Sequence, residues 1–283
     1  IELQIGNDII TNIDFINEKN YLIALNNNLK NLNKDQIYKV SKNSLIREII
    51  KKIELVKFFD LEKSNVLTEG LVKNLYKNLK FNNKNEFNSY LKNYNLNTEK
   101  VGKKILIEAL WNQLIFDKFN KNVKIDENKL KVKLKNELNK NKIEEFNLSE
   151  IVFQVDSNEK IEEKNKKILN FIKNNGFENA ANSFSASDSS KFGGKIGWVN
   201  KTQISKTILD KVNNLKTGEI TNPIQINNGY IILKLEDKRS VKKNVDIDKE
   251  LKKLIVFEKE KQLNQYSLMY FYRIKKNLFI NES

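Results

Sequence analysis

The chain has 283 residues and a formal net charge of +15, yet it contains no histidine and no cysteine. These two absences exclude serine or cysteine nucleophiles activated by histidine, histidine proton shuttles and the usual zinc ligand sets. Hydrophobic residues make up 39% and charged residues 31% of the sequence, which is typical of a folded globular protein with two domains or one body carrying a large insertion.

The first half of the chain is predicted to be helical after a short hairpin. The first ten residues alternate around the turn Gly6-Asn7-Asp8, as two short paired strands do. Beyond them, apolar residues recur at three- and four-residue steps, which indicates amphipathic helices. We expect these helices over residues 13–29, 34–60, 67–81, 84–94, 97–121 and 126–140.

From about Ile143 the pattern changes to that of a small α+β unit. It predicts a strand within 147–155, helices over 158–174 and 178–184, a Ser/Gly-rich loop over 183–197, a helix near 204–215 and a strand over 230–235.

The chain ends with a predicted helix over residues 246–276 and the short apolar run Leu278-Phe279-Ile280. One terminal helix cannot bury its apolar stripe alone, so we expect it to pack on the N-terminal helices. The final apolar run is then expected to pair with the N-terminal hairpin.

The positive charge raises the question of nucleic-acid or membrane binding. Lysines are spread among Asn, Glu and Leu along the helices, and arginine occurs only at Arg47, Arg239 and Arg273. This pattern favours a solvated basic surface, so we expect no nucleic-acid partner. There is no run of about 18 apolar residues, so no stable membrane insertion is expected.

Five motifs follow one another between Asn147 and Arg239. They are Asn147-Leu-Ser-Glu-Ile-Val-Phe, Gly176-Phe-Glu-Asn-Ala-Ala, Gly193-Gly-Lys-Ile-Gly-Trp, Leu215-Lys-Thr-Gly-Glu-Ile, and Pro223 followed by Asn228-Gly-Tyr-Ile-Ile. In this order and spacing they resemble the landmarks of the parvulin, or rotamase, family of peptidyl-prolyl isomerases.

The flanking segments resemble the body of SurA-like periplasmic chaperones. The resemblance rests on Ile5-Gly-Asn-Asp-Ile-Ile-Thr and on the final helix with Leu278-Phe279-Ile280. It implies a mainly α fold with an α+β insertion, in which residues 1–142 and 241–283 form a helical chaperone body and residues 143–240 form one parvulin-like domain. It also implies a periplasmic location after removal of a signal peptide, clients that are unfolded or extended polypeptides such as outer-membrane proteins, and no cofactor. The oligomeric state stays open.

The parvulin pattern also assigns candidate site residues. The family's first histidine falls on Glu150, its Cys or Asp on Ser187, its second histidine on Ile231, and a small polar position on Asn228; the apolar walls of the proline pocket fall on Ile196, Ile204 and Ile208. No metal ligand is implied. The isoleucines could equally be ordinary core. Glu150 could be a solvated strand residue or could pair with a lysine such as Lys195.

Three functions follow, in the order in which we favour them. The first is a chaperone that holds unfolded clients and has a weakly active or inactive isomerase domain. The second is an active isomerase in which Glu150, Ser187 and backbone donors replace the histidines. The third is nucleic-acid binding. Several aromatic residues are candidates for a client groove, although their helical spacing is more typical of core; they are Trp111, Phe116, Tyr266, Tyr270 and Phe271.

Overall fold

The computed structural model describes residues 3–61, 65–138, 143–155, 159–227, 229–241 and 246–282. The chain divides into two compact units. Unit 1 comprises Ile1–Lys118 with Met269–Ser283, and unit 2 comprises Phe119–Leu268. The expected fold class, mainly helical with an α+β part, is confirmed. The domain limits at 142/143 and 240/241 stay predictions.

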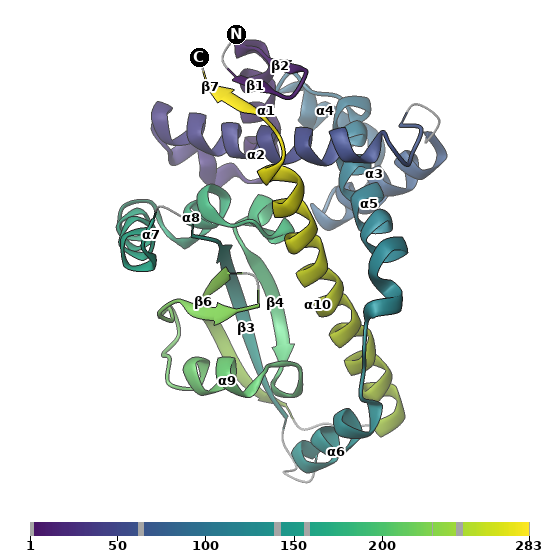
Figure 1. Cartoon of the computed structure of the whole chain (residues 1–283), viewed down its shortest axis with the longest axis vertical. Coiled ribbons are helices and arrows are strands. Elements are labelled where there is room, and N and C mark those ends of the chain that lie inside the picture. Colours follow the sequence, from purple (N-terminus) through teal and green to yellow (C-terminus); the bar gives the residue numbers. More distant parts are fainter. Residues whose placement is uncertain are drawn as a thin grey trace. The chain divides into compact units, whose positions relative to one another are not determined.

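Unit 1 contains a three-stranded antiparallel sheet formed by both ends of the chain (Figure 1). Strand β1 (Leu3–Ile5) lies between β2 (Asp8–Ile10) and β7 (Ile280–Glu282). Ile5 pairs with Ile280, and its side chain is fully buried. The predicted pairing of the final apolar run with the hairpin is therefore confirmed.

The rest of unit 1 is helical, and its helices begin where the sequence supplies capping residues. Thr11 and Asp14 form a reciprocal capping box at one helix start, as Asn33 and Gln36 do at another. The elements are α1 (Asn12–Leu25), η1 (Asn27–Asn31), α2 (Lys34–Leu55), α3 (Asn65–Asn78), α4 (Lys84–Lys92), most of α5 (Thr98–Phe119) and the last residues of α10 (Ile247–Lys276).

Aromatic residues that were candidates for a client groove mostly form the core of unit 1. Trp111 is fully buried, and its ring centroid lies 5.7 Å from that of Tyr270 and 6.4 Å from that of Phe271. Phe116 is 39% exposed. Tyr266 belongs to unit 2, where it stacks on Phe119 at 4.9 Å. The core interpretation therefore holds for Trp111, Tyr270 and Phe271.

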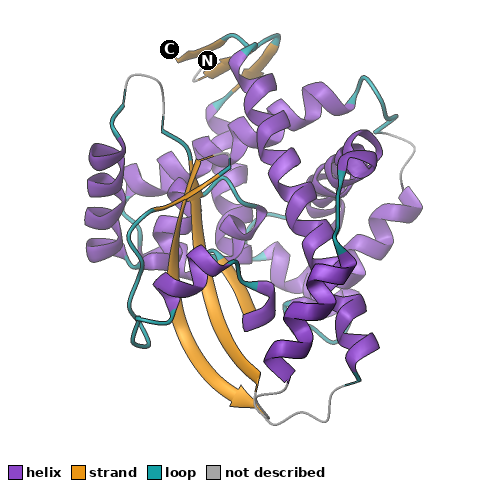
Figure 2. Cartoon of the chain, turned by 60° about the horizontal axis from the view of Figure 1, so that its bottom comes forward, coloured by secondary structure: helices purple, strands orange, loops and turns teal. Residues whose placement is uncertain are grey.

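Unit 2 is built on a four-stranded antiparallel sheet in the order β4-β3-β6-β5 (Figure 2). The strands are β3 (Ile143–Phe153), β4 (Lys195–Asn200), β5 (Ile224–Ile226) and β6 (Gly229–Val241). The helical elements are η2 (Asn120–Asn122), α6 (Glu127–Leu138), α7 (Ile161–Asn175), α8 (Phe177–Phe184), η3 (Asp188–Phe192), η4 (Lys201–Gln203), α9 (Lys206–Val212) and the first two thirds of α10.

Two sequence-based expectations for unit 2 are wrong. Strand β4 begins within the segment expected to be a Ser/Gly-rich loop. The sequence did not indicate this strand because it lacks a buried alternating pattern: Ile196 and Trp198 are 41% and 39% exposed. Strand β6 continues to Val241 instead of ending at Leu235, because its polar second half pairs with the first half of β3. In both cases cross-strand pairing, which local composition does not show, decides the length.

The two faces of this sheet have separate apolar clusters, as strand alternation requires. On one face Ile151, Phe153 and Ile232 pack with residues of α7 and α8. On the other face Val152 and Ile231 pack with residues of α9 and α10. The candidate site lies on this second face.

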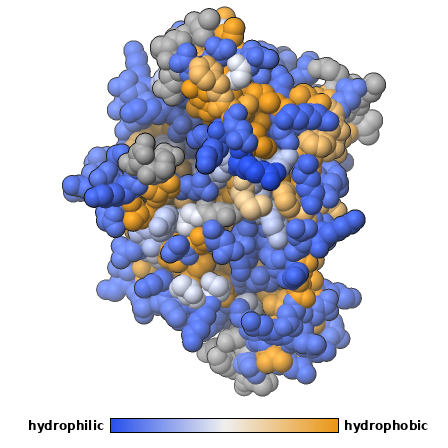
Figure 3. All heavy atoms as spheres, in the orientation of Figure 1, coloured by the Kyte–Doolittle hydropathy of each residue, from blue (hydrophilic) through white to orange (hydrophobic). Residues whose placement is uncertain are grey.

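The visible surface is mostly hydrophilic, with apolar residues in separate groups (Figure 3). Among the described residues, no helix combines the length and apolar character needed to cross a bilayer.

Candidate functional site

A cavity of about 300 Å³ lies on the second face of the unit 2 sheet. Its base is formed by β3, where Leu148, Glu150 and Val152 occupy alternate positions and therefore point to the same face. Six of the seven residues that the parvulin resemblance singled out line this cavity: Glu150, Ser187, Ile196, Ile204, Ile208 and Ile231. The seventh, Asn228, lies outside the described residues.

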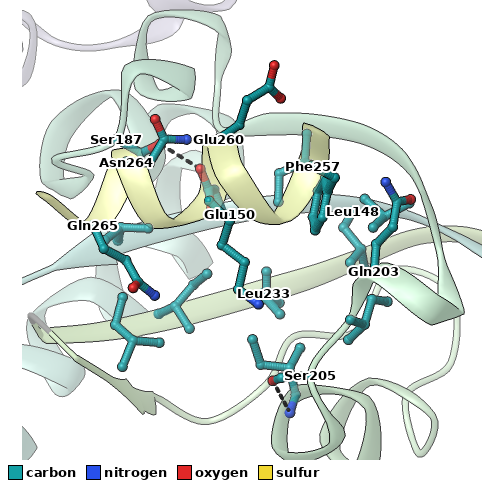
Figure 4. Close-up of a pocket in the computed structure, with 18 of the residues that line it drawn as sticks. Leu148, Glu150, Ser187, Gln203, Ser205, Leu233, Phe257, Glu260, Asn264 and Gln265 are labelled. Atoms are coloured by element: carbon teal, nitrogen blue, oxygen red, sulfur yellow. Dashed lines mark hydrogen bonds between the residues drawn. The ribbon is translucent and has the colours of Figure 1, made fainter. Parts of the chain in front are cut away.

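The polar floor of the cavity centres on Glu150. Its Oε1 accepts hydrogen bonds from Ser187 Oγ at 2.6 Å and from Ser189 Oγ at 2.9 Å, and Figure 4 shows the first of these. Glu150 stands at the position of the family's first histidine and Ser187 at its Cys or Asp position. The two side chains are therefore in contact, although they are 37 residues apart in sequence. Ser189 was not singled out from the sequence.

Burial raises the pKa of the Glu150 carboxyl above its ordinary value, because a buried carboxylate loses its hydration. The hydrogen bonds from Ser187 and Ser189 oppose this shift, and the nearby Asp188 carboxylate adds to it. Within the described part of the chain no lysine or arginine lowers this pKa, and Lys195, which the sequence left open as a partner, pairs with Glu178 at 2.9 Å. The sequence left open a solvated Glu150 or a pair with a lysine such as Lys195, and the buried, serine-bonded carboxyl matches neither possibility.

The position of Glu150 depends on a close backbone approach by Gly194. The Glu150 N–H donates to the Gly194 carbonyl oxygen at 2.7 Å. A Cβ at residue 194 would lie 2.3 Å from the Glu150 carbonyl oxygen, and Gly194 has φ +78°. Only glycine satisfies both conditions, which explains the second glycine of the Gly193-Gly194 motif.

The apolar walls of the cavity differ in burial. Ile204 and Ile231 are 5% and 8% exposed, Ile208 is half-buried, and Ile196 is 41% exposed at the rim. Ser205 caps α9 by accepting the Ile208 N–H at 3.4 Å, which holds Ile208 at the first turn of that helix. The walls are therefore partly core and partly open to a ligand.

One side of the cavity was missed by the sequence analysis, which assigned residues 241–283 to the chaperone body. Helix α10 contributes six lining residues: Phe257, Glu260, Lys261, Asn264, Gln265 and Leu268. The sequence signal for this cavity wall is a second set of residues spaced three and four apart along α10. Such spacing shows that the residues share a helix face, but it does not show which part of the protein that face contacts.

Among the described residues, no group of three or more Asp, Glu, His or Cys side chains is placed to hold a metal ion. The chemistry available in the cavity is that of apolar contacts, hydroxyls, amides, two carboxyls and the amine of Lys261.

Comparison with known families identifies the part of the chain that builds this cavity. Residues 146–237 match the family model described as Rotamase, PPIC-type PPIASE domain. The chain carries a PPIC-type rotamase domain. The rotamase domain contains all seven residues singled out by the parvulin resemblance, whereas the α10 side of the cavity lies beyond its C-terminal limit.

The sequence relatives of the chain are chaperones and foldases. A stretch of 61 residues is 44% identical to chaperone SurA of Pseudomonas putida, covering 22% of this chain and 14% of that protein. A stretch of 84 residues is 36% identical to foldase protein PrsA of Bacillus subtilis, covering 29% of this chain and 28% of that protein. The matches thus span well under a third of these relatives, and the chain is similar to SurA-like chaperones that carry a rotamase domain.

Solved structures give the same relatives over longer stretches. PrsA of Bacillus anthracis is 20% identical, with 84% of this chain and 98% of that chain covered and a TM-score of 0.33. A structure from a study of PEB4 and Cj1289, described as SurA-like chaperones of Campylobacter jejuni, is 18% identical over 81% of this chain and 89% of that one, with a TM-score of 0.32. Because these identities and TM-scores are low, the rotamase domain is identified by the family match of residues 146–237.

Proposed function

We propose that the chain is a periplasmic chaperone for unfolded or extended polypeptides, with outer-membrane proteins among its clients. Its rotamase domain binds X-Pro segments in the cavity and has little or no isomerase activity. The observation that carries this proposal is the cavity itself, which keeps apolar walls at Ile204, Ile208 and Ile231 above a floor without histidine.

The walls suit a proline ring with its neighbouring residues. A volume of about 300 Å³ is at the lower end of the range of roughly 300–1,000 Å³ for small-ligand pockets. A short extended segment fits such a volume, whereas a folded surface does not enter it. Apolar side chains supply affinity for the ring, and the cavity's few polar groups orient the peptide.

Isomerisation requires more than binding. The C–N rotation barrier is about 18–20 kcal/mol, and a catalyst lowers it by favouring the twisted amide over the planar one through placed hydrogen-bond donors. In this floor the Ser187 and Ser189 hydroxyls donate to the Glu150 carboxylate. Their protons are therefore engaged, which supports weak or absent turnover.

Exposed apolar residues of unit 1 support client binding by the body. Ile9, Ile13 and Ile16 are 55%, 68% and 46% exposed, and Ile9 lies on β2, an edge strand of its sheet. Unfolded outer-membrane strands alternate apolar and polar residues, so they present side chains that such a surface can hold weakly.

A second candidate function is an active, histidine-free isomerase. One observation favours it: burial raises the pKa of the Glu150 carboxyl, which shifts the group toward its protonated form. A protonated carboxyl donates a hydrogen bond, and a donor near the prolyl nitrogen is what the twisted amide needs.

The test is an NMR exchange measurement of cis–trans isomerisation on a short X-Pro peptide, with the full chain, Ile208→Asp and Leu209→Asp. Both positions are half-buried on α9 and pack against the same apolar cluster, but only Ile208 lines the cavity. Amide spectra of both variants report whether the fold is retained. We expect the peptide to bind, with little rate enhancement, and Ile208→Asp alone to abolish binding.

Two results would change this assignment. A clear rate enhancement that Ile208→Asp removes and Leu209→Asp keeps would make the active isomerase the better reading. Failure of the chain to delay aggregation of a urea-diluted outer-membrane protein would contradict the chaperone proposal.

A further inference from the structure

One face of α10 forms a wall of the cavity. Phe257, Lys261, Gln265 and Leu268 follow one another at steps of four, four and three residues, so they share a helix face, and all four line the cavity. Phe257 and Leu268 pack against the apolar cluster of the sheet. Figure 4 shows Phe257 and Gln265 extending from the helix toward the strands, with Glu260 pointing away.

This wall is tied to the sheet near the site. Gln265 Oε1 accepts a hydrogen bond from Asn227 Nδ2 at 3.2 Å, and Asn227 lies in the turn between β5 and β6. Together with the apolar contacts of Phe257 and Leu268, this bond places the wall beside the segment that leads to Ile231. A peptide bound over Ile231 therefore contacts α10 on its flank.

Lys261 gives this wall its electrostatic character. It is the one cation among the described residues that line the cavity, and it lies between Phe257 and Gln265 on the shared face. Its amine contacts Glu258 at 3.3 Å, with side chains 36% and 21% exposed. Charge-assisted hydrogen bonds are commonly about 2.7–2.9 Å long, so both contacts of the Lys261 amine with the Glu258 carboxylate, at 3.3 and 3.4 Å, are longer than usual.

Besides Glu258, which does not line the cavity, two carboxyls lie near Lys261 or the floor, and neither pairs with Lys261. Glu150 is engaged by two serine hydroxyls at the floor. Glu260 points away from the apolar side chains of the cavity (Figure 4). An acidic side chain next to the bound proline thus finds the Lys261 amine within the wall, where it competes with Glu258.

We propose that α10 contacts the residue beside the proline of a bound peptide, and that Lys261 favours an acidic residue over a basic one at that position. The inference rests on the proposed X-Pro site and adds its substrate preference. A partly exposed ion pair contributes about 0.2–1 kcal/mol, which corresponds to a preference of up to about fivefold in Kd.

The net charge of +15 also attracts acidic peptides, so the local effect needs a matched control. Lys252 is exposed on the same helix and does not line the cavity. Lys261→Glu and Lys252→Glu change the net charge equally, and only the first changes the wall. The Debye length at physiological salt is about 8 Å, so measurements at that salt suppress the distant contribution.

The experiment measures Kd for X-Pro peptides that carry Glu, Gln or Lys on either side of the proline. The full chain is labelled at isoleucine methyl groups, and Ile204, Ile208 and Ile231 report on the cavity. We expect the order Glu, Gln, Lys from tightest to weakest for the unmodified chain and for Lys252→Glu. We expect no preference for Lys261→Gln and a reversed order for Lys261→Glu.

Equal effects of Lys261→Glu and Lys252→Glu would overturn the inference and leave the X-Pro site standing. Absence of methyl shifts with every peptide would overturn the site itself and the inference with it.

Discussion

Each unit holds a carboxyl group that is largely removed from water, and the two are held in different ways. In unit 1 the Glu18 side chain is fully buried and pairs with Lys104, which also pairs with Glu48. In unit 2 the partners of Glu150 are neutral serine hydroxyls. A cation compensates the first charge, whereas the second depends on hydrogen bonds alone.

Burial has different outcomes for the pKa values of Lys104 and Glu150. Burial lowers the pKa of Lys104, but Glu18 and Glu48 outweigh burial and hold it above its ordinary value, so Lys104 keeps its charge. Burial raises the pKa of Glu150 and favours its neutral form. The unit 1 carboxyl Glu18 is thus held by an ion pair, whereas burial shifts the unit 2 carboxyl Glu150 toward its protonated form.

Removing the cation of unit 1 is expected to have the largest effect. Lys104→Met leaves Glu18 buried without its compensating charge, and we expect a loss of about 3–5 kcal/mol in the free energy of unfolding. Urea denaturation followed by circular dichroism measures it. The control is Lys103→Met, which removes only an exposed pair with Glu99 and should cost at most about 1 kcal/mol. Equal losses in the two variants would contradict the structural role.

A smaller effect is expected from crowding the floor of unit 2. Gly194→Ala forces a Cβ against the Glu150 carbonyl oxygen at a positive φ, and we expect it to cost about 2–4 kcal/mol. Gly218→Ala isolates the backbone term, because Gly218 has φ +90° but no atom within 4 Å of the added Cβ, and should cost about 1 kcal/mol. A cost for Gly194→Ala no greater than for Gly218→Ala would show that the close approach is unimportant.

The smallest effect concerns the Glu150 charge. Because its pKa is raised in the folded state, Glu150 stabilises the fold at pH values below its unfolded pKa, and that contribution is lost as pH rises through the folded pKa. Glu150→Gln is neutral at every pH. We therefore expect the variant to gain stability relative to the unmodified chain as pH rises from 4 to 8. Thermal unfolding across this range measures the difference, and a constant difference would contradict the raised pKa.

Sequence patterns predicted much of the fold because the interactions concerned are local. Capping boxes such as Thr11 with Asp14 act within one turn, and the turn at Gly6 joins strands that are adjacent in sequence. The edge strand β4 was missed for the converse reason. Its residues alternate weakly and are half exposed, and its identity as a strand comes from pairing with β3, about 50 residues earlier.

The candidate site was predictable only in part. The rotamase motifs singled out Glu150, Ser187, Asn228 and four isoleucines, and all of these that the structure describes line one cavity. The motifs did not indicate Ser189 as a partner of Glu150, nor the wall supplied by α10. Both depend on side-chain contacts between segments that are distant in the chain.

The sequence by itself determined the periodicity of the helices, the order of the rotamase motifs and the absence of histidine chemistry, because composition and local spacing carry that information. The tertiary structure decided that two serines engage Glu150, that Lys195 binds Glu178 instead, and that Lys261 lies on a cavity wall. Burial and hydrogen bonding between distant segments arise only when the chain is folded, and these interactions set the charge and the shape of the site.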